Sequence, residues 1–216
     1  MSALIPYIPS LVQGALITLA SWLCAGAVSV ILGATFGILS CDYLGFTRIR
    51  TMIRCYTFVA KGIPAYVQIL IAYFVLPQLL GISISGFVAA NCALAFCSSG
   101  YVTEIVRAGI NAVPRGQWDA CFALGYPLRA TLTHVIGPQA LRALLPALCG
   151  ELEQLLKSTS LLATIGTTEL TRTGMNIISR ELNPLPVYLM IAVIYLLLSA
   201  LLQIAAFYAE REVRYG

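Results

Sequence analysis

Long stretches without charge constrain this chain more than any other feature. From Leu11 to Ser40 there is no Asp, Glu, Lys or Arg, and about 20 apolar residues suffice for a helix to cross the hydrocarbon core of a bilayer. Over all 216 residues, 59% are hydrophobic and only 10% are charged, whereas a soluble domain carries about 25% charged residues. A soluble fold of this length could not bury so much apolar surface. The sequence therefore predicts an all-α integral membrane protein, with residues 1–216 forming one domain.

Polar connections divide the chain into five apolar segments. Lys61, Gly62 and Pro64 interrupt the second segment, and the fourth is the least apolar. We expect five transmembrane helices, at about residues 11–40, 55–80, 87–109, 140–162 and 187–208. The first segment has no preceding Lys or Arg and is too long for a cleavable signal, so we expect it to remain in the protein.

The placement of basic residues predicts the orientation. An odd number of spans puts the termini on opposite sides, and cytoplasmic connections are enriched in Lys and Arg. With the N-terminus outside and the C-terminus cytoplasmic, ten of the thirteen basic residues fall inside or at the inner ends of spans. They are Arg48, Arg50, Arg54, Lys61, Arg107, Arg115, Arg129, Arg142, Arg211 and Arg214. The opposite orientation would place the same ten outside.

Composition also excludes several function classes. The basic residues lie between apolar runs and form no soluble basic face, so we expect no nucleic-acid partner. None of the seven cysteines forms a CxxC pair, so we read them as small apolar residues and expect no metal site. His134 has no carboxylate or cysteine at catalytic spacing. We therefore expect that the chain is not an enzyme.

The longest connection in the middle of the chain, residues 111–138, predicts a short helical cytoplasmic segment. Gln117 to Leu124 reads as a helix that ends at Gly125, and Pro127 can open a second short helix. Gly137 and Pro138 predict a bend into the fourth span.

One face of the first short helix is aromatic. Trp118, Cys121 and Phe122 fall at helical spacing on this face. It could fill a groove on another protein, or it could rest on lipid headgroups. Ala120 and Ala123 would allow close approach of a partner, and Asp119 suits the first helical turn.

This segment resembles the EAA loop of ABC importer permeases. That loop has Glu-Ala-Ala, three residues, Gly, nine residues and an Ile-x-Leu-Pro end; here the corresponding residues are Asp119-Ala120-Cys121, Gly125 and Val135-Ile136-Gly137-Pro138. The stretches EIVRAGINAVPRGQW, LLKSTSLLATIGTTEL and KGIPAYVQ resemble the polar amino acid permease branch. The resemblance extends from about Gly14 to Tyr208. Departures from the usual residues are Asp119, Cys121, Gly137 and Ser158.

The resemblance implies a permease subunit of an ATP-driven amino acid importer in the bacterial cytoplasmic (inner) membrane. The implied partners are an ATP-binding cassette ATPase dimer, a second permease that is identical or similar, an extracytoplasmic amino acid binding protein and membrane lipid. The chain lacks GxxxxGK[ST], so ATP and Mg²⁺ are expected in the ATPase and no cofactor in this chain. The expected ATPase-coupling residues are Arg115, Gly116, Trp118, Asp119, Ala120, Cys121, Ala123, Leu124, Gly125 and Pro138.

Polar residues within apolar segments are candidates for the substrate pathway, because charge inside a membrane is costly and usually faces a cavity. These candidates are Cys97, Glu151, Glu153, Lys157, Ser158, Thr159 and Ser160. Glu153 and Lys157 share a helical face, so they form either a structural ion pair or part of the pathway. In the last outer segment, Glu169, Arg172, Arg180 and Glu181 either dock the binding protein or belong to a solvated loop.

A stand-alone channel or secondary transporter for a small polar solute is the alternative function. Self-sufficient carriers are often built from internal repeats, and none is visible in this sequence.

Overall fold

The computed structural model describes residues 6–44 and 47–215, with side chains as far as Val213; the N-terminal residue and the side chain of Arg214 lie outside the described part. The described residues are helical and contain no strand, as the sequence predicts. The helices, several joined by 3-10 or π turns, are α1 (Ile8–Leu39), η2 (Asp42–Leu44), α2 (Thr47–Gly62), α3 (Ala65–Leu70), η3 (Ile71–Val75), α4 (Leu76–Leu80), α5 (Gly86–Asn111), α6 (Arg115–Ala123), α7 (Leu128–Ala130), η4 (Thr131–Ile136), α8 (Gly137–Ser158), η5 (Thr159–Ile165), α9 (Leu170–Glu181) and α10 (Pro184–Tyr215).

Three helices are long and apolar enough to cross a membrane: α1, α5 and α10. The pair formed by α2 and the α3–α4 run passes the same test only when its two halves are taken together. The predicted fourth span is α8, which carries four charged residues and is not among these candidates. The described chain therefore has three or four candidate spans by length and apolar content.

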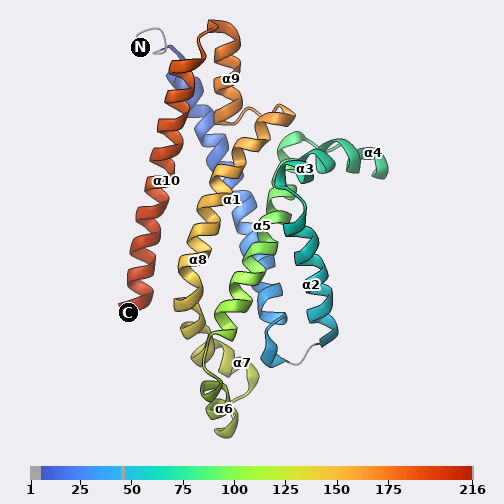
Figure 1. The fold of residues 1–216 in the computed structure, drawn as a ribbon, viewed down its shortest axis with the longest axis vertical. Helices are drawn as coiled ribbons and strands as arrows, with labels where there is room; N and C mark the ends of the chain where they lie inside the picture. The colour runs from blue at the N-terminus through green and yellow to red at the C-terminus, as the bar shows by residue number, and fades with distance from the viewer. Residues whose placement is uncertain (1–5, 45–46, 216) are drawn as a thin grey trace.

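The centre of the molecule is the packing of α1 along α5 (Figure 1). The buried face of α1 consists largely of Gly, Ala, Ser and Thr, and small residues let membrane helices approach closely. A Cβ atom added at Gly33 would lie 2.5 Å from Cβ of Val102, and one at Gly37 would lie 2.6 Å from Cβ of Val106. The contact between α1 and α5 therefore requires glycine at both positions.

The predicted second span, residues 55–80, is sharply bent where Lys61, Gly62 and Pro64 interrupt it. The helix α2 begins at Thr47, eight residues earlier, and the chain turns by 96° before the next helical run starts at Ala65. Pro64 has no N–H to continue the helical ladder and disfavours helical geometry in the residue before it. The run from α3 to α4 consequently projects sideways from the bundle (Figure 1).

The bend also moves Lys61 away from its predicted place at the inner end of a span. A Cβ atom on Gly100 would lie 2.8 Å from Cβ of Ala60 and 3.3 Å from the Lys61 side chain. Gly100 stands near the middle of the 26-residue helix α5. Lys61 therefore lies at the mid-height of the bundle.

The two ends of the bundle differ. The described N-terminal end of α1 and helix α9 lie at one end, which we call the α9 end, and α6 and α7 lie at the other, the α6 end (Figure 1). The helix α10 descends toward the α6 end and packs against α8 and α9. In the most apolar 18-residue stretch of α10, only 17% of the residues are buried, so most of its surface is free for lipid or another chain.

The predicted short helices of residues 111–138 are present. The first is α6, and Gly125 follows it with φ +74°, the left-handed conformation that ends a helix. The second differs from the prediction, because α7, η4 and α8 follow one another without a turn and Gly137 keeps helical dihedral angles. The π turn η4 accommodates Pro138, whose missing N–H would otherwise break the ladder. Gly137 and Pro138, where a bend was predicted, therefore lie at the start of α8 in continuous helical backbone.

Candidate functional site

The helix α6 presents to the outside a different face from the one predicted. Trp118 is fully buried and Cys121 is 5% exposed, so these two predicted docking residues pack inside the chain. Trp118 stacks on Tyr43 of η2, with ring centroids 4.4 Å apart and planes at 13°. Most of the aromatic face is thus packed within this chain, and of its three residues only Phe122, which is 50% exposed, reaches solvent.

The opposite side of α6 is open. Leu124 is 76% exposed, and a Cβ atom added at Gly116 or Gly125 would meet nothing within 4 Å. We call the following exposed residues the α6 surface: Arg115, Gly116, Asp119, Ala120, Phe122, Ala123, Leu124 and Gly125. Seven of the predicted coupling residues lie on it together with Phe122, while the predicted Pro138 is exposed further along, at the start of α8.

A cavity of about 310 Å³ opens where α2 breaks. We call it the bend pocket. Cys97, Glu151 and Ser158, three of the predicted pathway residues, line it. Its other polar side chains are Lys61, Ser98, Tyr101 and Gln154. Its volume is at the lower end of the range for small-molecule sites.

Charges in the bend pocket are unevenly compensated. The Lys61 ammonium lies 3.0 Å from Glu104 Oε2 and 5.6 Å from the centroid of the Tyr101 ring. Glu151 accepts a hydrogen bond of 2.7 Å from Ser98, and none of the ion pairs among the described residues involves it. The pocket therefore contains one carboxylate without a cationic partner.

Sequence reasoning missed the contribution of Gln68. Its amide nitrogen donates to the carbonyl oxygens of Ala60 and Ile63 at 2.8 and 2.7 Å. The Ala60 carbonyl lies in the last turn of α2 and the Ile63 carbonyl follows its last residue, Gly62, where the break removes helical partners. The spacing of Gln68 four residues after Pro64 is the sequence signal that could have indicated this role.

The remaining predicted pathway residues lie elsewhere. Glu153 accepts from Lys157 at 2.7 Å and from Gln203 of α10 at 3.1 Å, so this ion pair faces α10 and does not line the bend pocket. The hydroxyl groups of Thr159 and Ser160 donate to carbonyls three residues back. The structure thus separates Glu151 and Ser158 from the Glu153–Lys157 pair.

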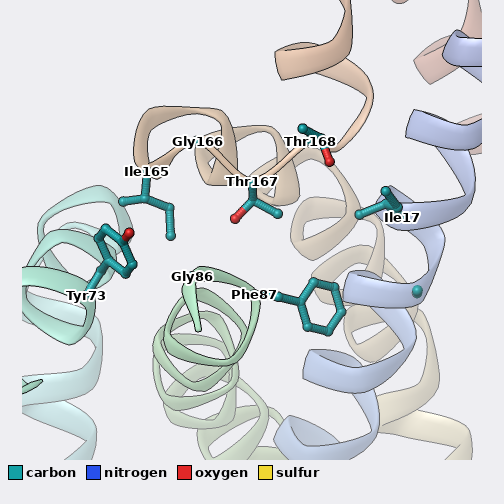
Figure 2. A pocket seen from close by; sticks show the side chains of 9 residues that line it. Ile17, Tyr73, Gly86, Phe87, Ile165, Gly166, Thr167 and Thr168 are labelled. Carbon is teal, nitrogen blue, oxygen red and sulfur yellow. The ribbon is translucent and has the colours of Figure 1, made fainter. Parts of the chain in front are cut away.

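A second cavity, of about 440 Å³, lies at the α9 end. Figure 2 shows Ile165 and Thr167 above the start of α5 at Gly86 and Phe87, with Tyr73 and Ile17 on its two sides. Since Phe87 and Cys97 belong to the same helix, this outer pocket lies about 15 Å along α5 from the bend pocket. Buried apolar residues, including Leu94 and Leu162, form a cluster along the same part of α5.

The segment after this cavity is a helix with a buried carboxylate. Glu169 is fully buried and caps α9, accepting from the backbone N–H groups of Thr171 and Arg172 and from the hydroxyl of Tyr195. Burial raises the pKa of Glu169, although these hydrogen bonds act in the opposite direction. Glu169 is therefore unavailable as the predicted docking residue.

Comparisons with known proteins agree with this architecture. Residues 29–215 match the family described as a binding-protein-dependent transport system inner membrane component. The chain is 35% identical to the arginine transport system permease protein ArtQ of Bacillus subtilis, over 99% of this chain and 96% of the relative. It is 32% identical to the glutamine transport system permease protein GlnP of Escherichia coli K12, over 99% and 97%.

Solved structures give the same result. A crystal structure of an amino acid ABC transporter with histidines matches with a TM-score of 0.88 and 32% identity, over 97% of each chain. The MetNI methionine ABC transporter matches with a TM-score of 0.85 at 21% identity, which supports the fold. The protein is therefore an ABC importer permease, a transport component and not a catalytic subunit. It belongs to the family of binding-protein-dependent transport system inner membrane components.

Proposed function

We propose that this chain is the permease subunit of an importer for a polar amino acid in the bacterial cytoplasmic membrane. The observation that carries the proposal is its similarity, over nearly the whole length, to permeases named for arginine and glutamine transport. The chain would work with a second permease, an ATPase dimer that binds ATP and Mg²⁺, and an extracytoplasmic binding protein.

We propose five spans: α1, α2 with its bend, α5, α8 and α10. The four charged residues of α8 are compatible with a span if they face a cavity or another helix, and Glu151 and Glu153 do so. The α6 end, with Arg115 and Arg129, would be cytoplasmic by the positive-inside rule, and the N-terminus would lie outside. Membrane lipid would cover the exposed apolar side of α10.

The bend pocket is the proposed binding site for the solute. Broken helices at mid-membrane commonly form substrate sites in transporters, because their freed polar groups can bind a solute away from lipid. An amino acid carries an ammonium group, and Glu151 is the carboxylate of the pocket without a cationic partner. Gln154, Ser158 and Tyr101 would supply the remaining polar contacts.

The α6 surface is the proposed docking site for the ATPase. Its small residues, Gly116, Ala120 and Ala123, would let a partner approach the helix backbone, while Leu124 supplies an apolar contact. ATP-driven movement of the ATPases would displace α6 and change the access of the pathway.

Reconstitution tests this function directly. The chain is incorporated into liposomes with and without its ATPase, in the presence of the binding protein, and uptake of radiolabelled arginine and glutamine is measured. Uptake of one of them only when ATPase and ATP are present supports the proposal. Uptake by the chain alone contradicts it and favours a stand-alone channel or secondary transporter.

The residue assignment needs its own variants. Glu151→Gln keeps the shape of the pocket side chain and removes its charge, so uptake should fall about tenfold or more while the ATPase still binds. Asp119→Asn, which removes an exposed charge, or Gly116→Val, which adds a side chain at an open position of α6, should instead reduce ATPase association. The matched control is Glu153→Gln, which changes a carboxylate of the same helix outside the pocket.

A further inference from the structure

The turn between α1 and α2 is attached to α6 through an aromatic stack. The ring of Tyr43 lies on that of Trp118 at 4.4 Å with nearly parallel planes. Trp118 is the largest fully buried side chain described, and its indole N–H has no hydrogen-bond partner. A buried indole N–H usually has a hydrogen-bond partner. Because this one has none, Trp118 is held by apolar packing and by its stack on Tyr43.

The same turn is attached to the end of α5 by two reciprocal hydrogen bonds. The Asn111 side-chain amide donates to Asp42 Oδ2 at 2.9 Å, and the backbone N–H of Asp42 donates to Asn111 Oδ1 at 3.2 Å. Arg50 of α2 forms an ion pair with the same Asp42 carboxylate. One short turn thus contacts α2, α5 and α6 through directional interactions.

The start of α8 joins this assembly from the other side. Gln139 donates to Gln117 of α6 at 3.3 Å. Trp118, Cys41 and Ile136 belong to one buried apolar cluster, with Tyr43 packed against it. Helices α1, α5 and α8 therefore meet in the cluster around Trp118, and α2 is joined to the adjacent turn through Arg50.

The other parts of the bundle lie outside this convergence. The helix α10 reaches this end through a hydrogen bond from Arg142 to the carbonyl of Val213, and the α3–α4 run projects from the opposite part of the molecule (Figure 1). A displacement of α6 thus has a direct physical path to some helices and not to others. Coupling between distant sites requires such a contiguous set of packed groups that moves as a unit.

We propose that Tyr43, Asp42 and Asn111 form a clamp that carries the displacement of α6 into the turn between α1 and α2. The inner ends of α1, α2, α5 and α8 then move as one body with the ATPase, while α10 and the α3–α4 run stay behind. These three are positioning residues. They do not line the bend pocket, and Tyr43 contacts α6 on its buried side. The inference rests on the proposed function, because it assumes that an ATPase moves α6.

The stack is tested with Tyr43→Ala and Tyr43→Phe. The first removes the ring that covers Trp118, and the second keeps it. In liposomes that contain the ATPase and the binding protein, Tyr43→Ala should retain ATP hydrolysis but transport about tenfold less radiolabelled arginine or glutamine per ATP. Tyr43→Phe should transport as the unchanged protein does. Phe58→Ala, which removes a 78% exposed ring of α2, is the matched control and should have no effect.

The hydrogen-bond pair is tested by an exchange of its two side chains. Asn111→Asp places a second carboxylate against Asp42, which removes the donor and adds repulsion, so uptake per ATP should fall. The double variant Asp42→Asn with Asn111→Asp again pairs an amide with a carboxylate and should recover part of that loss; the rest should stay lost, because the exchange also removes the carboxylate that pairs with Arg50. A residue needed only for its volume would show no such recovery.

The outcomes separate the clamp from the broader function. Unchanged uptake per ATP in both Tyr43→Ala and Asn111→Asp overturns the clamp, as does a loss in proportion to ATP hydrolysis. Loss without recovery in the double variant also overturns the pairing. A failure of the unchanged protein to associate with the ATPase overturns the proposed function instead, before any variant is compared.

Discussion

At the scale of single residues, the main problem of a broken membrane helix is the backbone carbonyls that the break leaves unpaired. Unpaired polar groups in a bilayer cost several kcal/mol each. Gln68 is placed to offset this cost, because its amide bridges the carbonyls of Ala60 and Ile63. The bend of α2 therefore depends on a side chain that lies after it in the sequence.

Replacing Gln68 with Leu should destabilise the protein. Leu is of similar size but cannot donate, so a buried and a partly buried carbonyl would lose this donor, at up to about 1–3 kcal/mol each. Thermal unfolding in detergent should occur at a lower temperature than for the unchanged protein. Gln203→Leu is a control on an exposed amide that donates to the Glu153 carboxylate; if it shifts unfolding equally, the proposed role of Gln68 is wrong.

The buried carboxylate of Glu169 predicts a dependence of stability on pH. Burial raises its pKa in the folded protein, so the folded state holds the proton more tightly than the unfolded state. Stability from this group is then fully present below the ordinary glutamate pKa and declines as pH rises through the raised one. The unfolding temperature, measured from pH 4.5 to 7.5, should fall more steeply with pH than in Glu169→Gln. Parallel curves would contradict this account.

At the scale of elements, glycine positions decide how α1 meets its neighbours. Gly33 would place a Cβ atom 2.5 Å from Val102, whereas Gly26, on the same helix, would place one 3.6 Å from Leu152 and Leu155, an ordinary contact. The two glycines therefore differ sharply in the space around them.

The variants Gly33→Ala and Gly26→Ala form a matched pair. The first should push α1 and α5 apart and lower the unfolding temperature and the yield of folded protein, since overpacking costs about 1–3 kcal/mol. The second should be neutral or slightly stabilising, because alanine favours a helix. Equal effects of the two substitutions would show that the α1–α5 contact is looser than described.

Element boundaries were predictable where local chemistry sets them. Gly125 ends α6 as predicted because few other residues adopt its left-handed conformation. The interruption of the second segment at Lys61, Gly62 and Pro64 was read from the sequence, but the 96° angle of the bend was not, because hydropathy carries no direction. Trp118 shows another limit: an aromatic face at helical spacing looks the same whether its partner is Tyr43 of the same chain or another protein. Glu151 and Ser158 both line the bend pocket because they are seven residues apart on one helix. The presence of Lys61 in the same pocket depends on the angle of the bend after α2, which the sequence did not show.

At the scale of the whole molecule, the bundle is asymmetric. One end holds the buried cap of α9, and the other presents the α6 surface. Besides Arg115 and Asp119, the residues of the α6 surface are small or apolar, and Leu124 among them is 76% exposed. We expect their cost in water to be offset by a partner.

Leu124→Asp should therefore weaken the binding of the ATPase without harming the fold. A charge in the centre of a protein contact is costly, while Leu124 is 76% exposed in this chain. Co-purification with the ATPase should drop and the unfolding temperature should not change. Leu182→Asp, which alters an 84% exposed leucine at the other end, provides the comparison and should leave co-purification intact.

The burial of Trp118 has an optical consequence. The chain contains two tryptophans: Trp22, whose indole donates to the carbonyl of Leu152, and Trp118, which is shielded from water and lies against a tyrosine ring. Replacing Trp22 with Phe would leave a single tryptophan, in the cluster where α6 packs against α1, α5 and α8. Its emission wavelength and quenching by iodide would then report, in real time and without any attached label, whether that cluster opens to water while ATP is consumed.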